Sequence, residues 1–146
     1  MNPDSPSMNL YRLLTEIFVL LDDADNRVLG QHNLTVRQFY ALYHLDRERG
    51  MSINELSARL LCGKSNATRL VERLKQEGLV VRERDATDRR YVCVRLTDTG
   101  VQLRRQAMAI HQESVERRFE NLSAEAKAAL HELLTFLRDD LRRQLN

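Results

Sequence analysis

The sequence from Ser52 to Gly78 reads SINELSARLLCGKSNATRLVERLKQEG and predicts two helices joined by a tight turn. Ser52 and Glu55 have the spacing of a capping box, in which each side chain accepts a hydrogen bond from a free amide of the first turn. After a turn at residues 61–63, apolar residues recur at helical spacing until Gly78, a residue type that commonly follows the end of a helix. Two helices separated by a three-residue turn that contains glycine are typical of a helix-turn-helix.

After Gly78 the apolar residues change to the period of a β-strand. Residues 79–84 (LVVRER) and 91–96 (YVCVRL) read as two strands, and the polar segment DATDRR lies between them. This pattern predicts a β-hairpin with a charged tip, the wing of a winged helix-turn-helix. On the second strand we expect Val92, Val94 and Leu96 to face the core and Cys93 to face away from it, because side chains alternate along a strand.

Long amphipathic segments flank the predicted helix-turn-helix and wing on both sides. Apolar spacing predicts helices over about 10–29, from Thr35 toward Gly50, from Thr97 to about 121, and after Ser123. The first and last helices carry more apolar surface than a chain of this size needs, so we expect them to pack against a second copy in a symmetric dimer. The alternative is a monomer in which both helices cover the winged domain.

The expected fold class is mainly α with a small β-hairpin wing: a winged helix-turn-helix flanked by long N- and C-terminal dimerisation helices. We expect a disordered tail over residues 1–7. Residues 8–30 and 98–146 form the predicted helical dimerisation region, and residues 31–97 form the predicted DNA-binding domain.

The charge is concentrated in one part of the chain, although the net charge is only +2. Residues 1–58 carry a net −3, residues 59–95 carry +5, and residues 96–146 carry 0. A basic central stretch favours a polyanionic partner, nucleic acid first. A solvated surface with no partner is the alternative.

The composition argues against several other classes of protein. The apolar runs are too short to span a membrane, and the first residues do not resemble a signal peptide, so we expect a cytoplasmic protein. The two cysteines make no disulfide framework, and no Cys or His cluster has zinc spacing. Without a Gly-rich phosphate loop, a suitable carboxylate pair or a nucleophile beside a base, we predict no enzyme, no metal and no cofactor.

The helix after the turn has the features of a recognition helix. Its apolar residues fall on one face, and small polar and basic side chains gather in its first two turns, the part that enters a major groove. Arginine can bridge guanine and asparagine can pair with adenine, whereas residues at the helix start suit phosphates. The candidate DNA-binding residues here are Lys64, Ser65, Asn66, Thr68, Arg69 and Arg73. An ordinary surface helix is the alternative.

The wing supplies further cationic candidates. Arg84, Arg89 and Arg90 lie on or beside the hairpin tip, where arginine suits the negative potential of a narrow minor groove. Asp88 is unexpected beside phosphates, so we expect it to hold an arginine fork in a fixed geometry. A solvated tip with a local ion pair is the alternative.

At this point the chain resembles the MarR family of bacterial regulators. The resemblance rests on ELS at 55–57, SNATRLVERL at 65–74, EGLV at 77–80, DRR at 88–90, VRLT at 94–97 and Gly100. It extends over nearly the whole chain. It implies a homodimeric repressor with winged helix-turn-helix lobes that binds a pseudo-palindromic double-stranded operator. It also implies that Arg90 reaches the minor groove with support from Asp88.

The same resemblance implies that a small aromatic or phenolic acid releases the DNA. Candidate residues for an effector site lie near the expected junction of the dimerisation helices and the DNA-binding lobe: Tyr11, Arg12, His32, Phe39 and Tyr43. Their alternative role is as core or loop residues. The family's peroxide-sensing branch carries a cysteine in the first helix, which this sequence lacks. Redox control through Cys62 or Cys93 is a second alternative, and a winged-helix protein-interaction module without DNA binding is a third.

Overall fold

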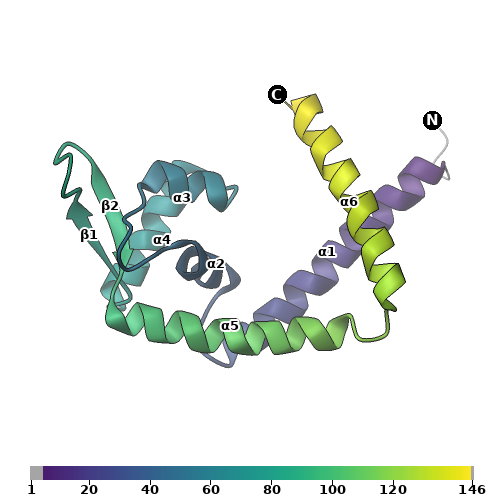
Figure 1. The fold of residues 1–146 in the computed structure, drawn as a ribbon, viewed down its shortest axis with the longest axis horizontal. Helices are drawn as coiled ribbons and strands as arrows, with labels where there is room; N and C mark the ends of the chain where they lie inside the picture. Colours follow the sequence, from purple (N-terminus) through teal and green to yellow (C-terminus); the bar gives the residue numbers. More distant parts are fainter. Residues whose placement is uncertain (1–4, 146) are drawn as a thin grey trace. The chain divides into compact units, whose positions relative to one another are not determined.

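The computed structural model describes residues 5–145, and the expected order of helices and strands is confirmed (Figure 1). Contacts divide the chain into two compact units, one ending at His111 and one beginning at Gln112. The elements are α1 (Pro6–Gly30), α2 (Val36–His44), α3 (Ile53–Arg59), α4 (Lys64–Gln76), β1 (Val80–Arg84), β2 (Val92–Leu96), α5 (Asp98–Arg118) and α6 (Ala124–Leu145).

The first helix begins earlier than the sequence pattern predicts. Ser5 caps α1 by accepting a hydrogen bond from the amide of Met8 at 3.2 Å, and Pro6 starts the helix with its pre-set φ angle. Residues 6 and 7, expected in the disordered tail, therefore form the first turn of α1. Residues 1–4 of that expected tail lie outside the described part of the chain.

Local capping signals position the helices of the DNA-binding lobe, the part of the chain from α2 to β2. The capping box of Ser52 and Glu55 is present at the start of α3, and Thr35 and Gln38 form a second one at α2. α2 ends at His44, earlier than the expected limit at Gly50. Gly78, with a φ of +73°, follows α4 in the left-handed conformation that commonly ends a helix.

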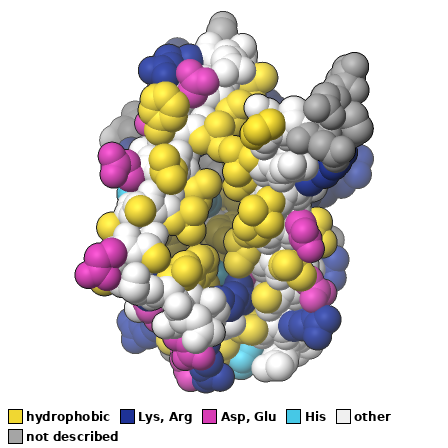
Figure 2. Space-filling model, turned by 90° about the vertical axis from the view of Figure 1, so that its right-hand side faces the viewer, with side chains coloured by type: hydrophobic (Ala, Val, Ile, Leu, Met, Phe, Trp, Pro, Cys, Tyr) yellow, Lys and Arg dark blue, Asp and Glu magenta, His cyan; other side chains and the backbone are white. Residues whose placement is uncertain are grey.

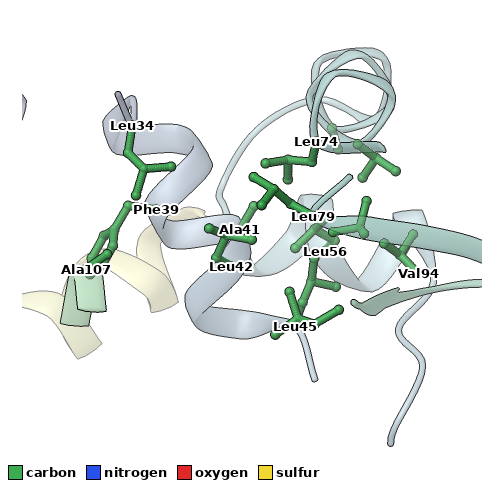
Figure 3. Close-up of a cluster of buried hydrophobic side chains, with 14 of the residues drawn as sticks. Leu34, Phe39, Ala41, Leu42, Leu45, Leu56, Leu74, Leu79, Val94 and Ala107 are labelled. Atoms are coloured by element: carbon green, nitrogen blue, oxygen red, sulfur yellow. The ribbon is translucent and has the colours of Figure 1, made fainter. Parts of the chain in front are cut away.

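The core of the lobe lies between α2, α3, α4 and the hairpin. Buried apolar side chains from each of these elements meet there, with Ala107 of α5 at one side (Figure 3). The two strands pair antiparallel, and Val80 lies opposite Leu96. The structure thus places the recognition helix and the wing on one packed support.

The predicted alternation along β2 is wrong at its first two residues. Val92 is exposed and Cys93 is buried. Met51 bridges to Val94 along the free edge of β2 and brings Gly50 over Cys93, where an added Cβ would lie 2.4 Å from the cysteine sulfur. This short extra pairing covers the face that the sequence pattern assigned to solvent.

The outer helices keep large apolar side chains uncovered. In α1 these include Leu13, Phe18 and Leu20, and none of the residues 124–145 of α6 is buried. Such side chains are visible as yellow atoms on the surface in Figure 2. Within residues 5–145, no helix has the length and apolar character needed to cross a membrane.

Candidate nucleic-acid interface

The first turns of α4 present small and polar side chains to solvent. Lys64, Ser65, Asn66 and Arg69 are all exposed, while Ala67 between them is buried in the core. The N-cap residue is Gly63, and in the described structure no side chain caps the first amides of this helix. Those N–H groups therefore stay available to an anion, as the partial positive charge of a helix N-terminus favours.

Two of the predicted α4 residues have partners within the lobe. The hydroxyl of Thr68 donates to the carbonyl of Lys64 at 2.9 Å, which turns it toward its own helix. The Nε of Arg73 donates to Glu77 at 3.3 Å. Arg73 also lines a groove of about 500 Å³ with Arg37 and Arg69. Asp22 also lines this groove, so its three arginines outnumber one carboxylate.

The tip of the hairpin is ordered by one carboxylate. Oδ1 of Asp85 accepts hydrogen bonds from the amides of Thr87 and Asp88, at 2.8 and 3.1 Å, and from the hydroxyl of Thr87. These hydrogen bonds, first that of the Thr87 hydroxyl, lower the pKa of Asp85 below its ordinary value. The tip is closed by the amide of Asp85, which donates to the carbonyl of Tyr91 at 2.8 Å.

Asp88 holds Arg90 in a two-point grip, as the sequence predicts. The Nε and Nη2 of Arg90 donate to Oδ1 and Oδ2 of Asp88 at 3.0 and 2.7 Å, and the amide of Arg90 also donates to Oδ1. The arginine side chain remains 83% exposed. The hydrogen bonds from the Arg90 side chain hold the pKa of Asp88 below its ordinary value, so the pair is charged at neutral pH. An exposed guanidinium is thereby fixed in direction.

The other arginines of the wing divide between structural contacts and open surface. Arg84 donates to the carbonyl of Arg89 at 2.9 Å and ties the strand to the tip. Arg82 pairs with Glu72 of α4 at 2.7 Å, which links the wing to the recognition helix. Arg89 is exposed at the tip. The predicted DNA-binding residues therefore lie on two neighbouring elements that are joined by an ion pair.

The candidate effector residues do not converge within this unit. Tyr11 and Arg12 line a hollow of about 420 Å³ on α1. Phe39 is buried and stacks on His111 with ring centroids 4.7 Å apart, whereas His32 and Tyr43 are exposed. Tyr11 precedes Asp25, the residue of α1 beside His111, by 14 positions, which corresponds to about 21 Å of helix. A site that includes all five residues is therefore not formed by one chain.

Sequence reasoning missed three polar features of the lobe. Buried Asp25 and half-buried His111, with 3.1 Å between Oδ1 and Nε2, join α1 to α5. Gln38, also buried, joins α2 to Glu77 at the end of α4. His44 has its pKa lowered, first by burial and then by the charge of Arg59. Only the Gln38 position had a local signal, since it completes the capping box of Thr35.

The two cysteines lie in different environments. Cys93 is buried and Cys62 is half-buried in the turn before α4, and both are free thiols. Among residues 5–145 no group of three or more His, Cys, Asp or Glu side chains could hold a metal ion.

Comparison with known proteins gives consistent matches. The family model described as MarR family matches residues 32–90. The uncharacterized HTH-type transcriptional regulator YkoM of Bacillus subtilis is 30% identical over 128 residues, which are 88% of this chain and 83% of that protein. The HTH-type transcriptional regulator PecS of Dickeya dadantii is 30% identical over 90% of this chain and 81% of its own length.

Solved structures extend the similarity to the whole described fold. A mutant MarR from E. coli, crystallised in complex with operator DNA, has a TM-score of 0.82 and 26% identity, covering 94% of this chain and 99% of its own. A MarR family protein from Bacillus stearothermophilus has a TM-score of 0.79 and 27% identity, covering 97% and 99%. The winged helix-turn-helix fold and both outer helices are thus shared.

Proposed function

Because the chain belongs to the MarR family of transcriptional regulators, we propose that it is a homodimeric repressor of a pseudo-palindromic operator in double-stranded DNA, acting in the cytoplasm. α4 enters the major groove and the hairpin tip reaches the adjoining minor groove. One observation carries the proposal: the exposed Arg90 fork, held at two points by Asp88, lies on a hairpin that the Arg82–Glu72 ion pair joins to a helix with polar and basic exposed residues. The E. coli relative bound to operator DNA supports it.

The residues divide by the part of the duplex that each contacts. Lys64 and Ser65 bind phosphates beside the uncapped start of α4. Asn66 and Arg69 read base edges, since both are exposed in the first two turns of α4. Arg90 enters the minor groove. Thr68, Arg73, Arg84, Asp88 and Arg89 position or flank these contacts.

Dimerisation is proposed from the uncovered outer helices. Phe18 on α1 and Leu133 and Phe136 on α6 are each more than two-thirds exposed, which is unusual for large apolar side chains of a folded protein. A second copy that covers these faces would set the spacing of the two recognition helices. Successive major grooves on one side of DNA require about 34 Å between them.

The proposed effector is a small aromatic acid. The open hollow on α1 offers Arg12, which shares it with Glu16, for the carboxylate and Tyr11, Val19 and Leu20 for the ring. An effector that binds better to a dimer unsuited to DNA lowers operator affinity by its differential affinity for the two states. Benzoate derivatives added to a DNA-binding assay test this: release of wild-type protein but not of Arg12→Ala is expected, and equal release of both contradicts the site.

The DNA-binding proposal is tested by footprinting on the DNA upstream of the protein's own coding region, with affinity measured by fluorescence anisotropy at several salt concentrations. We expect a protected inverted repeat and a loss of about a thousandfold or more in affinity between about 50 and 200 mM salt, because several phosphates are neutralised. Failure to bind any duplex from a random library in dilute buffer contradicts the proposal and favours a protein-interaction module.

A further inference from the structure

Gln38 is a buried polar side chain at the contact between α2 and α4. It is only 2% exposed. Its Oε1 accepts from the amide of Thr35 at 3.0 Å, and its Nε2 donates to both carboxylate oxygens of Glu77 at 3.2 Å. Because the same nitrogen lies at equal distance from both oxygens, the amide points at the carboxylate group as a whole. The buried amide is therefore satisfied at both ends, and it fixes the carboxylate of Glu77.

The same carboxylate also holds Arg73, one turn earlier on α4. The Nε of Arg73 donates to Oε1 of Glu77 at 3.3 Å, and the arginine side chain is 66% exposed. An isolated exposed ion pair of this spacing on a helix contributes little to stability. Glu77 differs from that case because the buried amide of Gln38 immobilises it from the opposite side.

Arg73 is held with most of its donors facing outward. Its Nε is used by Glu77, and the two terminal nitrogens carry four more N–H groups. The side chain lines the groove that contains Arg37 and Arg69. A guanidinium that is already restrained loses less conformational freedom on binding than a free one does.

We propose that Glu77 is a positioning residue for DNA binding: anchored by buried Gln38, it aims the guanidinium of Arg73 at a phosphate of the duplex. This inference rests on the proposed function and names the contact made beyond the first turns of the recognition helix. Glu77 itself touches no DNA.

For removal of the Glu77 charge, the proposal predicts a change in DNA affinity opposite to the one expected from charge alone. Glu77 is a negative charge on a surface proposed to face phosphates, so its removal should by itself strengthen DNA binding. If it positions Arg73, its removal should weaken binding instead. Glu77→Gln is the suitable change, because glutamine keeps the size of the side chain and can still accept from Gln38.

A double-mutant cycle separates the two effects. Wild type, Glu77→Gln, Arg73→Ala and the double variant are compared by fluorescence anisotropy on one duplex over a series of salt concentrations, and each variant's melting temperature is recorded as a control for folding. We expect Glu77→Gln to weaken binding by about threefold to tenfold in the wild-type background, as coupled neighbours commonly do. In the Arg73→Ala background the same change should leave affinity unchanged or raise it.

The salt dependence gives a readout that a purely structural role would not move. Arg73→Ala should reduce the slope of log affinity against log salt by about 0.9, the value for one phosphate contact. Glu77→Gln should reduce the slope in the same direction by a smaller amount. Tighter binding by Glu77→Gln in both backgrounds overturns the proposal. Wild-type protein that binds no duplex overturns the proposed function as well, whereas wild-type binding with an additive cycle overturns only the role of Glu77.

Discussion

At the tip of the hairpin, one carboxylate determines the direction of an arginine side chain. Asp88 accepts two hydrogen bonds from the side chain of Arg90 and one from its amide. The pair is exposed, so it contributes little to folding. Its consequence is for binding, because an arginine fixed before it meets DNA has less freedom to lose.

Two substitutions distinguish the loss of the Arg90 side chain from the loss of the carboxylate that orients it. Arg90→Ala should weaken operator binding by about 1–3 kcal/mol with no change in melting temperature, since it removes a surface contact. Asp88→Asn should weaken binding by less, although it removes a negative charge from the DNA-binding surface. Anisotropy titrations and thermal melts measure both effects. Wild-type affinity in purified Arg90→Ala would refute the assignment of the wing.

A second residue makes the stability of the lobe depend on pH. Burial, followed by the charge of Arg59, lowers the pKa of His44 below its ordinary value of 6.5. The unfolded chain then binds a proton more readily than the folded chain, so stability rises with pH across this range. The contribution of neutral His44 is complete above about pH 6.5 and is lost as the pH falls through the lower folded-state value.

We expect His44→Gln to reduce the loss of stability on acidification. Urea midpoints of wild type and variant, measured at about pH 7.5 and pH 5.5, give the comparison. The matched control is His131→Gln, since His131 is exposed on α6. Equal acid sensitivity in wild type and His44→Gln would show that the half-buried imidazole does not contribute.

Among the elements, the turn between α3 and α4 contains a residue in an unfavourable conformation. Leu61 has a φ of 52° and is 91% exposed, so no packing compensates for its left-handed backbone. Asn33, the other non-glycine residue with positive φ within residues 5–145, is of a type that tolerates it.

Leu61→Asn should stabilise the protein by about 1 kcal/mol, because asparagine adopts the left-handed conformation at lower cost. The reverse change at the matched position, Asn33→Leu, should destabilise it by a similar amount. Denaturant unfolding of the two variants measures both values. A loss of stability in Leu61→Asn would mean that the leucine side chain has a partner, such as a second copy of the chain.

The elements also show what could be predicted from sequence. The caps at Ser52, Thr35 and Ser123 and the glycine after α4 are local signals, and each is confirmed. The start of α1 was missed although Ser5 and Pro6 are local signals, whereas the burial of Cys93 is a long-range effect. The bridge of Met51 to Val94, which buries Cys93, has no signature in local spacing, because it depends on where the chain runs after α2.

The same difference between local signals and long-range contacts applies to the candidate DNA-binding surface. The residues alone indicate that Asp88 holds an arginine of the wing, the family resemblance implies that it is Arg90, and this pairing is confirmed. The contact of Gln38 with Glu77 joins residues 39 positions apart. Periodicity could assign Gln38 to a helix but could not say which side chain meets it, since that requires the packing of α2 on α4.

At the scale of the whole molecule, the outer helices determine the proposed assembly. Leu133 of α6 is 68% exposed, so a lysine there should leave the fold of a single chain unchanged. In a dimer that covers this face, the same lysine would bury an unpaired charge at high cost. We expect Leu133→Lys to sediment as a monomer and to bind operator DNA weakly.

The neighbouring variant Glu132→Lys is the matched control, because it introduces the same residue on the same turn at a polar position. It should sediment as a dimer with near-normal affinity for DNA. If Leu133→Lys also sediments as a dimer, this part of α6 lies outside the interface.

The exposed surface of α6 also affects how the stability of this protein depends on its concentration. None of the 22 residues of α6 is buried, although in proteins most of the stability of a helix comes from packing of its apolar face. In the proposed dimer a second copy covers this surface, so the melting temperature should climb as protein concentration is raised. In a cell that makes few copies, the abundance of this regulator would set the fraction that is folded as well as the fraction of operators that are occupied.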